Sequence, residues 1–118
     1  MTIIHNNVDK FIALKPRYYK FLKTISFTRN ISTESDSRYD LELILSKLLV
    51  GEDDLRIRFK NVFGIKIGCL EGMFGLYIDI EDVSDRQLEG GTYRVVEQEE
   101  QTFSFYCEEF IAELISNL

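Results

Sequence analysis

Hydrophobic and polar residues alternate along much of the chain, a pattern typical of strands that bury one face. Between residues 23 and 31, Ile25, Phe27 and Ile31 share one side, while polar residues share the other. Alternating or apolar segments recur toward the C-terminus, separated by polar turns that often contain glycine. We therefore predict strands over residues 23–31, 55–60, 62–70, 74–81, 93–96 and 103–107.

Two segments fit more than one kind of element. Residues 40–50 are rich in leucine, at spacings that match both the apolar stripe of a helix and one face of a strand. A polar turn over residues 51–54 separates them from the strand over residues 55–60, so we favour a hairpin over a helix. The alternation breaks at residues 108–109, and residues 110–118 fit either a strand continued past a bulge or a closing helix.

The first 22 residues predict a helical or irregular segment. Asn6 or Asn7 can cap a short helix, because their side chains accept hydrogen bonds from unpaired backbone amides. Pro16 would stop this helix, since proline disfavours helical backbone in the residue before it. The apolar face of the helix holds Val8, Phe11 and Ile12.

Several short strands with turns between them predict a mainly β fold, either an antiparallel sandwich or a partly open barrel. One or two short helices can accompany this sheet, and an α+β fold is the alternative. With 118 residues, 45% of them hydrophobic, the chain is long enough to bury a core, and we expect a single domain over residues 1–118. We find no run of apolar residues long enough to cross a membrane.

Charge is distributed unevenly along the chain, although the net charge is only −6. Residues 1–30 hold six basic residues and one acidic residue, whereas residues 71–118 hold two basic and twelve acidic residues. Such a gradient can mark an interaction surface. Alternatively, the basic segment packs beside the acidic half and offsets its self-repulsion.

The acidic half is a candidate surface for binding a basic protein, because opposite charges speed association and orient the two partners. The alternative is a solvated acidic face that keeps the sheet soluble and its edges unpaired. If the partner acts on nucleic acid, an acidic surface can occupy the cleft that phosphates use. The candidate partner-binding residues are Asp79, Glu81, Asp82, Asp85, Glu97, Glu99, Glu100, Glu108 and Glu109, and Glu89 belongs to the same acidic half.

Metal binding and catalysis have little support in the sequence. The four carboxylates between residues 79 and 85 are hard oxygen ligands for Ca²⁺ or Mg²⁺, but Val83 and Ser84 break the spacing of an EF-hand loop. His5 is the sole histidine and lies in the N-terminal segment, which disfavours a nucleophile–histidine pair. No phosphate-binding glycine loop is present. We therefore predict no metal, no cofactor and no enzymatic activity.

Cys69 and Cys107 lie far apart in the sequence and outside any CxxC pair, which indicates reduced thiols and a cytoplasmic location. A disulfide between the two cysteines is the alternative. The start of the chain lacks the hydrophobic core of a signal peptide. Basic and aromatic residues mix over residues 15–23, and such a segment can bind phosphates and stack on bases. Because the acidic remainder would repel nucleic acid, we expect this segment to pack on the sheet instead.

Two further functions stay open. Aromatic rings in the sheet interior could line a pocket for a small molecule, although we expect them to fill the core. An uncovered sheet edge could pair with a second copy and give a homodimer. The rings in question are those of Phe59, Phe74, Phe103 and Phe105.

A shared pattern of apolar residues runs through Tyr39–Leu43, Leu55–Val62, Tyr93–Glu99 and Phe103–Phe110. This pattern, over residues 39–115, resembles that of small bacterial domains of the immunity-protein kind, which belong to polymorphic toxin systems. The resemblance implies a mainly β fold and assigns no catalytic residue. On this basis we predict a non-enzymatic, immunity-like protein that neutralises a basic partner through its acidic residues.

Overall fold

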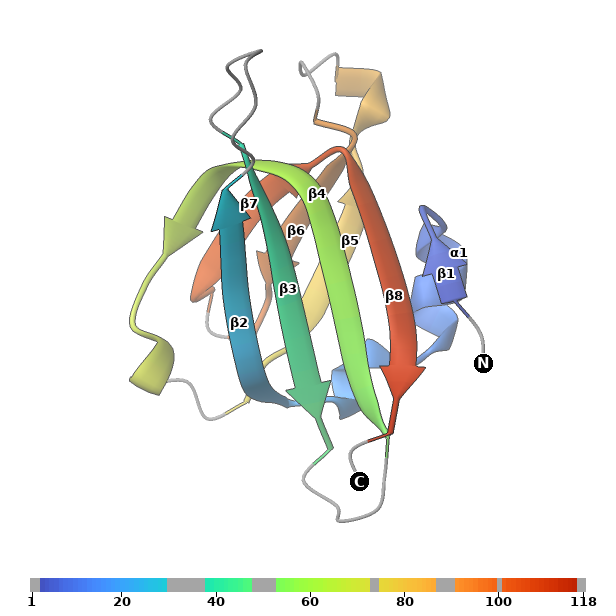
Figure 1. Cartoon of the computed structure of the whole chain (residues 1–118), viewed down its shortest axis with the longest axis vertical. Helices are drawn as coiled ribbons and strands as arrows, with labels where there is room; N and C mark the ends of the chain where they lie inside the picture. The colour runs from blue at the N-terminus through green and yellow to red at the C-terminus, as the bar shows by residue number, and fades with distance from the viewer. Residues whose placement is uncertain are drawn as a thin grey trace.

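The computed structural model describes residues 3–29, 38–47, 53–72, 75–86, 91–99 and 101–116. In these parts of the chain, eight strands form one antiparallel sheet that curls into a partly open barrel, accompanied by short helical segments (Figure 1). The prediction of a mainly β, antiparallel fold is confirmed.

The curled sheet has two layers that share one long strand, β4. The first layer contains, in spatial order, β1 (Ile3–His5), β8 (Glu109–Ile115), β4 (Asp54–Ile67), β3 (Tyr39–Ser46) and β2 (Phe21–Arg29). The second layer continues from the far half of β4 through β7 (Phe103–Cys107), β6 (Tyr93–Glu97) and β5 (Ile78–Asp82).

Strand β4 connects the layers because its backbone bends. Its first half pairs with β3 and β8, and its second half, from Phe63 to Ile67, pairs with β7. Asn61 and Gly64 both have positive φ angles, 54° and 65°, which turn the strand from one layer into the other. The sequence predicted two separate strands here, over residues 55–60 and 62–70, so this division was wrong.

Both ambiguous segments are strands. Strand β3 forms the favoured hairpin with β4, and Leu41, Leu43 and Leu45 are buried on its inner face. Residues 48–52 of the predicted helix stripe and turn lie outside the described part. Strand β8 follows the break at residue 108, and Phe110 and Ala112 are fully buried opposite β4, which rules out the closing helix over the described residues.

The core lies between the two layers, and aromatic rings meet inside it among aliphatic side chains. Phe59 and Phe105 meet edge to face, with ring centroids 4.9 Å apart, and Phe103 stacks on Phe105 at 6.3 Å. These three rings are at most 4% exposed, so they fill the core as expected instead of lining an open pocket. Phe74, the fourth ring considered for a pocket, lies outside the described residues.

A short helix, α1 (Val8–Ala13), lies beside β8 at the open side of the barrel (Figure 1). Asn7 caps it by accepting a hydrogen bond from the Lys10 amide at 3.0 Å, as predicted. Phe11 is buried against Phe110, with centroids 5.9 Å apart, whereas Ile12 is 53% exposed and not on the buried face as predicted. The 3-10 turns are η1 (Pro16–Tyr18), η2 (Leu70–Gly72) and η3 (Ser84–Arg86).

Candidate partner-binding surface

The cross-strand register divides the predicted acidic residues between two ends of the β5–β6–β7 layer. Asp82 lies opposite Tyr93, and Tyr93 lies opposite Cys107, at one end. Ile78 lies opposite Glu97 at the other end. Since β6 has five residues, about 13 Å of strand separates the two ends. The eight predicted residues that the structure describes therefore do not form one continuous acidic face.

Five of the predicted residues gather at the end formed by β5, η3 and the corner between β7 and β8. This corner and η3 lie at the top of Figure 1. We call the group the acidic rim. Four of its members are exposed, and Glu109 is half-buried. The acidic rim consists of Glu81, Asp82, Asp85, Glu108 and Glu109.

Local contacts orient the rim carboxylates on η3. The Asp82 Oδ1 atom accepts hydrogen bonds from the backbone amide of Ser84 at 2.9 Å and from its hydroxyl at 2.7 Å. These bonds favour the ionised form and lower the pKa of Asp82. Glu81 forms an ion pair with Arg86 at 2.7 Å. The start of η3 is therefore fixed as an anionic turn.

The corner between β7 and β8 brings the remaining rim carboxylates close to β1 and β4. Glu108 accepts a hydrogen bond from the Asn61 side-chain amide at 2.9 Å, and Glu109 lies 3.2 Å from the His5 imidazole. Burial raises the pKa of Tyr93, and the charges of Asp82, Cys107 and Glu109 raise it further. The carboxylates of Asp82 in β5 and Glu109 in β8 therefore both lie near the Tyr93 phenol.

Glu97 is a correction to the predicted surface. Its side chain is fully buried, and its carboxylate accepts hydrogen bonds from the backbone amides of Glu99, Thr102 and Tyr77 at 2.6, 3.3 and 3.4 Å. Glu97 therefore holds the β6–β7 turn and cannot sit on an exposed acidic face. The alternation of Tyr93, Val95 and Glu97 was the sequence signal for this inward position.

The other predicted residues at this lower end are separated from the rim. Asp79 is half-buried and accepts a hydrogen bond from the Gln98 side chain at 3.1 Å. Glu99 is exposed in the β6–β7 turn. Glu100, like Glu89, lies outside the described residues.

The comparisons with known proteins identify the kind of domain that carries this rim. The family model of "Immunity protein PIM8" matches residues 3–113. The chain belongs to the PIM8 immunity protein family. No curated protein and no solved structure matches the chain. The predicted resemblance to immunity proteins is thereby confirmed, and it gives this family member a protein-binding role with a toxin as the implied partner.

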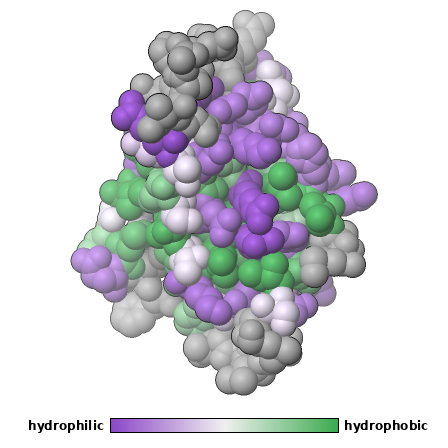
Figure 2. Space-filling view, viewed as in Figure 1, coloured by the Kyte–Doolittle hydropathy of each residue, from purple (hydrophilic) through white to green (hydrophobic). Residues whose placement is uncertain are grey.

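The outer face of β2, β3 and β4 in this immunity protein carries a charge network that the sequence analysis missed. Arg58 forms ion pairs with Glu42 at 3.4 Å and with Glu113 at 3.9 Å, and Arg56 donates a hydrogen bond to Glu113 at 2.8 Å. Glu113 is only 7% exposed. The cations here are balanced by carboxylates, so this face is less suited than the rim to long-range attraction. In Figure 2, polar side chains occupy the middle of the face, with hydrophobic ones beside them.

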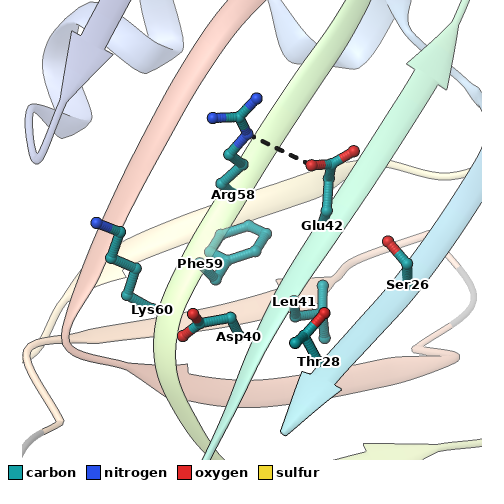
Figure 3. Close-up of a pocket in the computed structure, with 8 residues that line it drawn as sticks. All are labelled: Ser26, Thr28, Asp40, Leu41, Glu42, Arg58, Phe59 and Lys60. Carbon is teal, nitrogen blue, oxygen red and sulfur yellow. Dashed lines mark ion pairs between the residues drawn. The ribbon is translucent and has the colours of Figure 1, made fainter. Parts of the chain in front are cut away.

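A shallow depression of about 150 Å³ lies on this outer face. Figure 3 shows Ser26 and Thr28 of β2 on one side of it and Arg58 and Lys60 of β4 on the other. The acidic residues of the depression lie on β3 and the basic residues lie on β4. The predicted hairpin between these two strands was the sequence signal that could have brought them together. The lining residues are Ser26, Thr28, Asp40, Leu41, Glu42, Arg58, Phe59 and Lys60.

Among the described residues, the lysines and arginines of the basic N-terminal segment form no ion pair with the acidic rim. Within the described chain, Lys15, Arg17 and Lys20 form no ion pair, and Arg17 lies over the Tyr77 ring at 5.9 Å. The segment borders a depression of about 290 Å³ in which Tyr18 is 56% exposed. The aromatic packing expected for this segment is seen at Tyr19, which is buried.

Across the described ranges, no group of three or more histidine, cysteine, aspartate or glutamate side chains is arranged to hold a metal ion, the carboxylates from Asp79 to Asp85 included.

Cys69 is exposed and Cys107 is buried, and both are free. Burial raises the pKa of the Cys107 thiol to about 12. No helix among the described residues is long and apolar enough to span a membrane.

Proposed function

We propose that this immunity protein neutralises a basic protein toxin by binding it through the acidic rim, without catalysing a reaction. Family membership supports a toxin as the partner and a non-enzymatic role. The observation that carries the rim as the contact surface is the gathering of five carboxylates, four of them exposed, at one corner. In the described part of the chain, Asp82, Asp85 and Glu108 form no ion pair. Their negative charge is available to a partner.

Binding by such a rim follows from electrostatics. Opposite charges raise the association rate and orient the partners before contact, and salt screens this attraction. For a partner that acts on nucleic acid, the rim carboxylates would occupy the cationic cleft used by phosphates. The protein then needs no cofactor, because occlusion alone blocks the partner. We place this encounter in the cytoplasm, where free thiols such as Cys69 stay reduced.

A pair of matched variants tests the rim. The rim variant combines Asp85→Lys with Glu108→Lys, and the control variant combines Glu71→Lys with Glu99→Lys. All four positions are exposed, and both variants change the net charge equally. Glu97 is not used, because its reversal would disrupt the fold. The wild type and both variants serve as parallel baits for a lysate of the source organism, followed by kinetics with the purified bound protein.

We expect the rim variant to associate roughly tenfold or more slowly at low salt, with a flatter dependence on salt concentration. The control variant should behave like the wild type. Equal slowing of both variants would show that net charge, not the rim, drives binding. Unchanged kinetics in the rim variant would place the contact on another surface, and a captured protein without a basic surface would contradict the charge argument.

A further inference from the structure

Among the described strands, β1, β5 and β2 lie at edges of the sheet, and two of these strands are protected from pairing with another chain. Strand β1 has only three residues, which is too short to form a stable template. Strand β5 carries the carboxylates of Asp79, Glu81 and Asp82 and contacts α1. Charges and covering elements of this kind block edge-to-edge association.

The third edge, β2, lacks such protection. This nine-residue strand pairs with β3 on one side and, among the described strands, with nothing on the other (Figure 1). Residues 24–28 contain no charge, proline or glycine, and four of the five are exposed. Phe27 belongs to the inner face of the sheet, opposite Leu41, yet it is 39% exposed and contacts only the edge of the Tyr39 ring among the described aromatics.

We propose that β2 pairs antiparallel with β2 of a second copy of this chain, about a two-fold axis at Ser26. In this register Ser26 faces Ser26, Thr24 faces Thr28, and Ile25 faces Phe27 of the other copy. Hydroxyl pairs and pairs of an aromatic with a β-branched residue are favourable opposite neighbours in a sheet. About four to six backbone hydrogen bonds would form, and the exposed Phe27 ring would be covered.

The charges beside this segment permit the same register. The bulge between Leu22 and Thr24 displaces Lys23 from the regular alternation, and its ammonium is held by the buried Asp54 carboxylate at 2.9 Å. Arg29, by alternation, follows Phe27 on the inner face. The uncharged five-residue segment can therefore pair without placing free like charges opposite each other. The acidic rim lies on other strands, so this proposal does not rest on the proposed function.

The oligomeric state tests the pairing. Light scattering and sedimentation over a range of concentrations should show a monomer–dimer equilibrium for the wild type. Ser26→Lys places two cations opposite each other at the axis and should raise the dissociation constant roughly tenfold or more. Gln98→Lys, an exposed change of equal charge in the β6–β7 turn, should leave it unchanged. Thermal melting of both variants checks that the fold is retained.

The register is tested by disulfide trapping in a Cys69→Ser background. Ser26→Cys brings two thiols together across the axis, at Cα separations of about 4.5–5.5 Å that suit a disulfide, and should yield a covalent dimer under mild oxidation. Thr24→Cys should not, because it faces Thr28 of the other copy. A strict monomer, a dimer insensitive to Ser26→Lys, or trapping at residue 24 instead of 26 would each overturn the proposal. So would a monomer whose β2 amides become protected only when a toxin is added.

Discussion

At the residue scale, buried Glu97 is an acidic side chain that we expect to stabilise the fold. Its carboxylate accepts three backbone hydrogen bonds that hold the β6–β7 turn. Glu97→Ala leaves these amides unsatisfied and should lower the free energy of unfolding by about 3 kcal/mol. Glu99→Ala, two residues away and exposed, should change it by less than about 0.5 kcal/mol. Urea unfolding compares the two, and equal losses would contradict the role assigned to Glu97.

The turn at Asp82 makes a prediction about titration. Ser84 lowers the pKa of Asp82, so Ser84→Ala should raise this pKa toward the ordinary value of an aspartate. Because the folded pKa is the lower one, the stabilisation is present at neutral pH and is lost as the pH falls through the folded pKa. NMR titration of the Asp82 carboxyl carbon measures the shift. An unchanged pKa in the variant would show that the hydroxyl bond has no influence.

The sequence revealed the candidate site only in part. Asp82, Asp85 and Glu108 follow apolar strands and were correctly expected to be exposed. Glu97 was assigned to the surface because glutamate is usually exposed, although the alternation with Tyr93 and Val95 pointed inward. Burial of a carboxylate depends on backbone donors brought from Tyr77 and Thr102, and their proximity arises only after folding.

At the element scale, the bend of β4 depends on Gly64. Its φ angle of +65° is unfavourable for other residues, and an added Cβ would lie 3.2 Å from the Tyr106 ring. Gly64→Ala should therefore lower the free energy of unfolding by about 1–2 kcal/mol. At Gly68, an added Cβ would meet only a carbonyl oxygen, at an ordinary 3.4 Å, so Gly68→Ala is the matched control. Calorimetry that finds equal losses would show that the bend does not require glycine.

Elements were predicted best where the pattern had a single interpretation. The alternation in β7, for example, identified the inward positions of Phe103, Phe105 and Cys107. The leucines of β3 fitted helix and strand equally, and pairing with β4 decided the outcome. The continuity of β4 through Asn61 and Gly64 could not be predicted, because alternation carries no information about φ.

At the scale of the whole molecule, composition and turn spacing were sufficient to predict a mainly β antiparallel fold. They could not predict that the single strand β4 joins the two layers, nor the separation of the acidic residues into two ends. That separation follows from the register of β5, β6 and β7, which places Asp82 near Tyr93 and Asp79 opposite Val96. Surface hypotheses drawn from a charge gradient therefore need the pairing of the strands before residues are grouped.

Neutralisation of a toxin is tested most directly by a growth assay. The protein captured from the source organism is expressed in test cells, alone or together with the wild type, the rim variant or the control variant. We predict that the captured protein arrests growth, that the wild type and the control variant restore it, and that the Asp85→Lys, Glu108→Lys rim variant protects poorly at equal expression. A captured protein that does not impair growth, or growth arrest that the wild type fails to relieve, would contradict neutralisation.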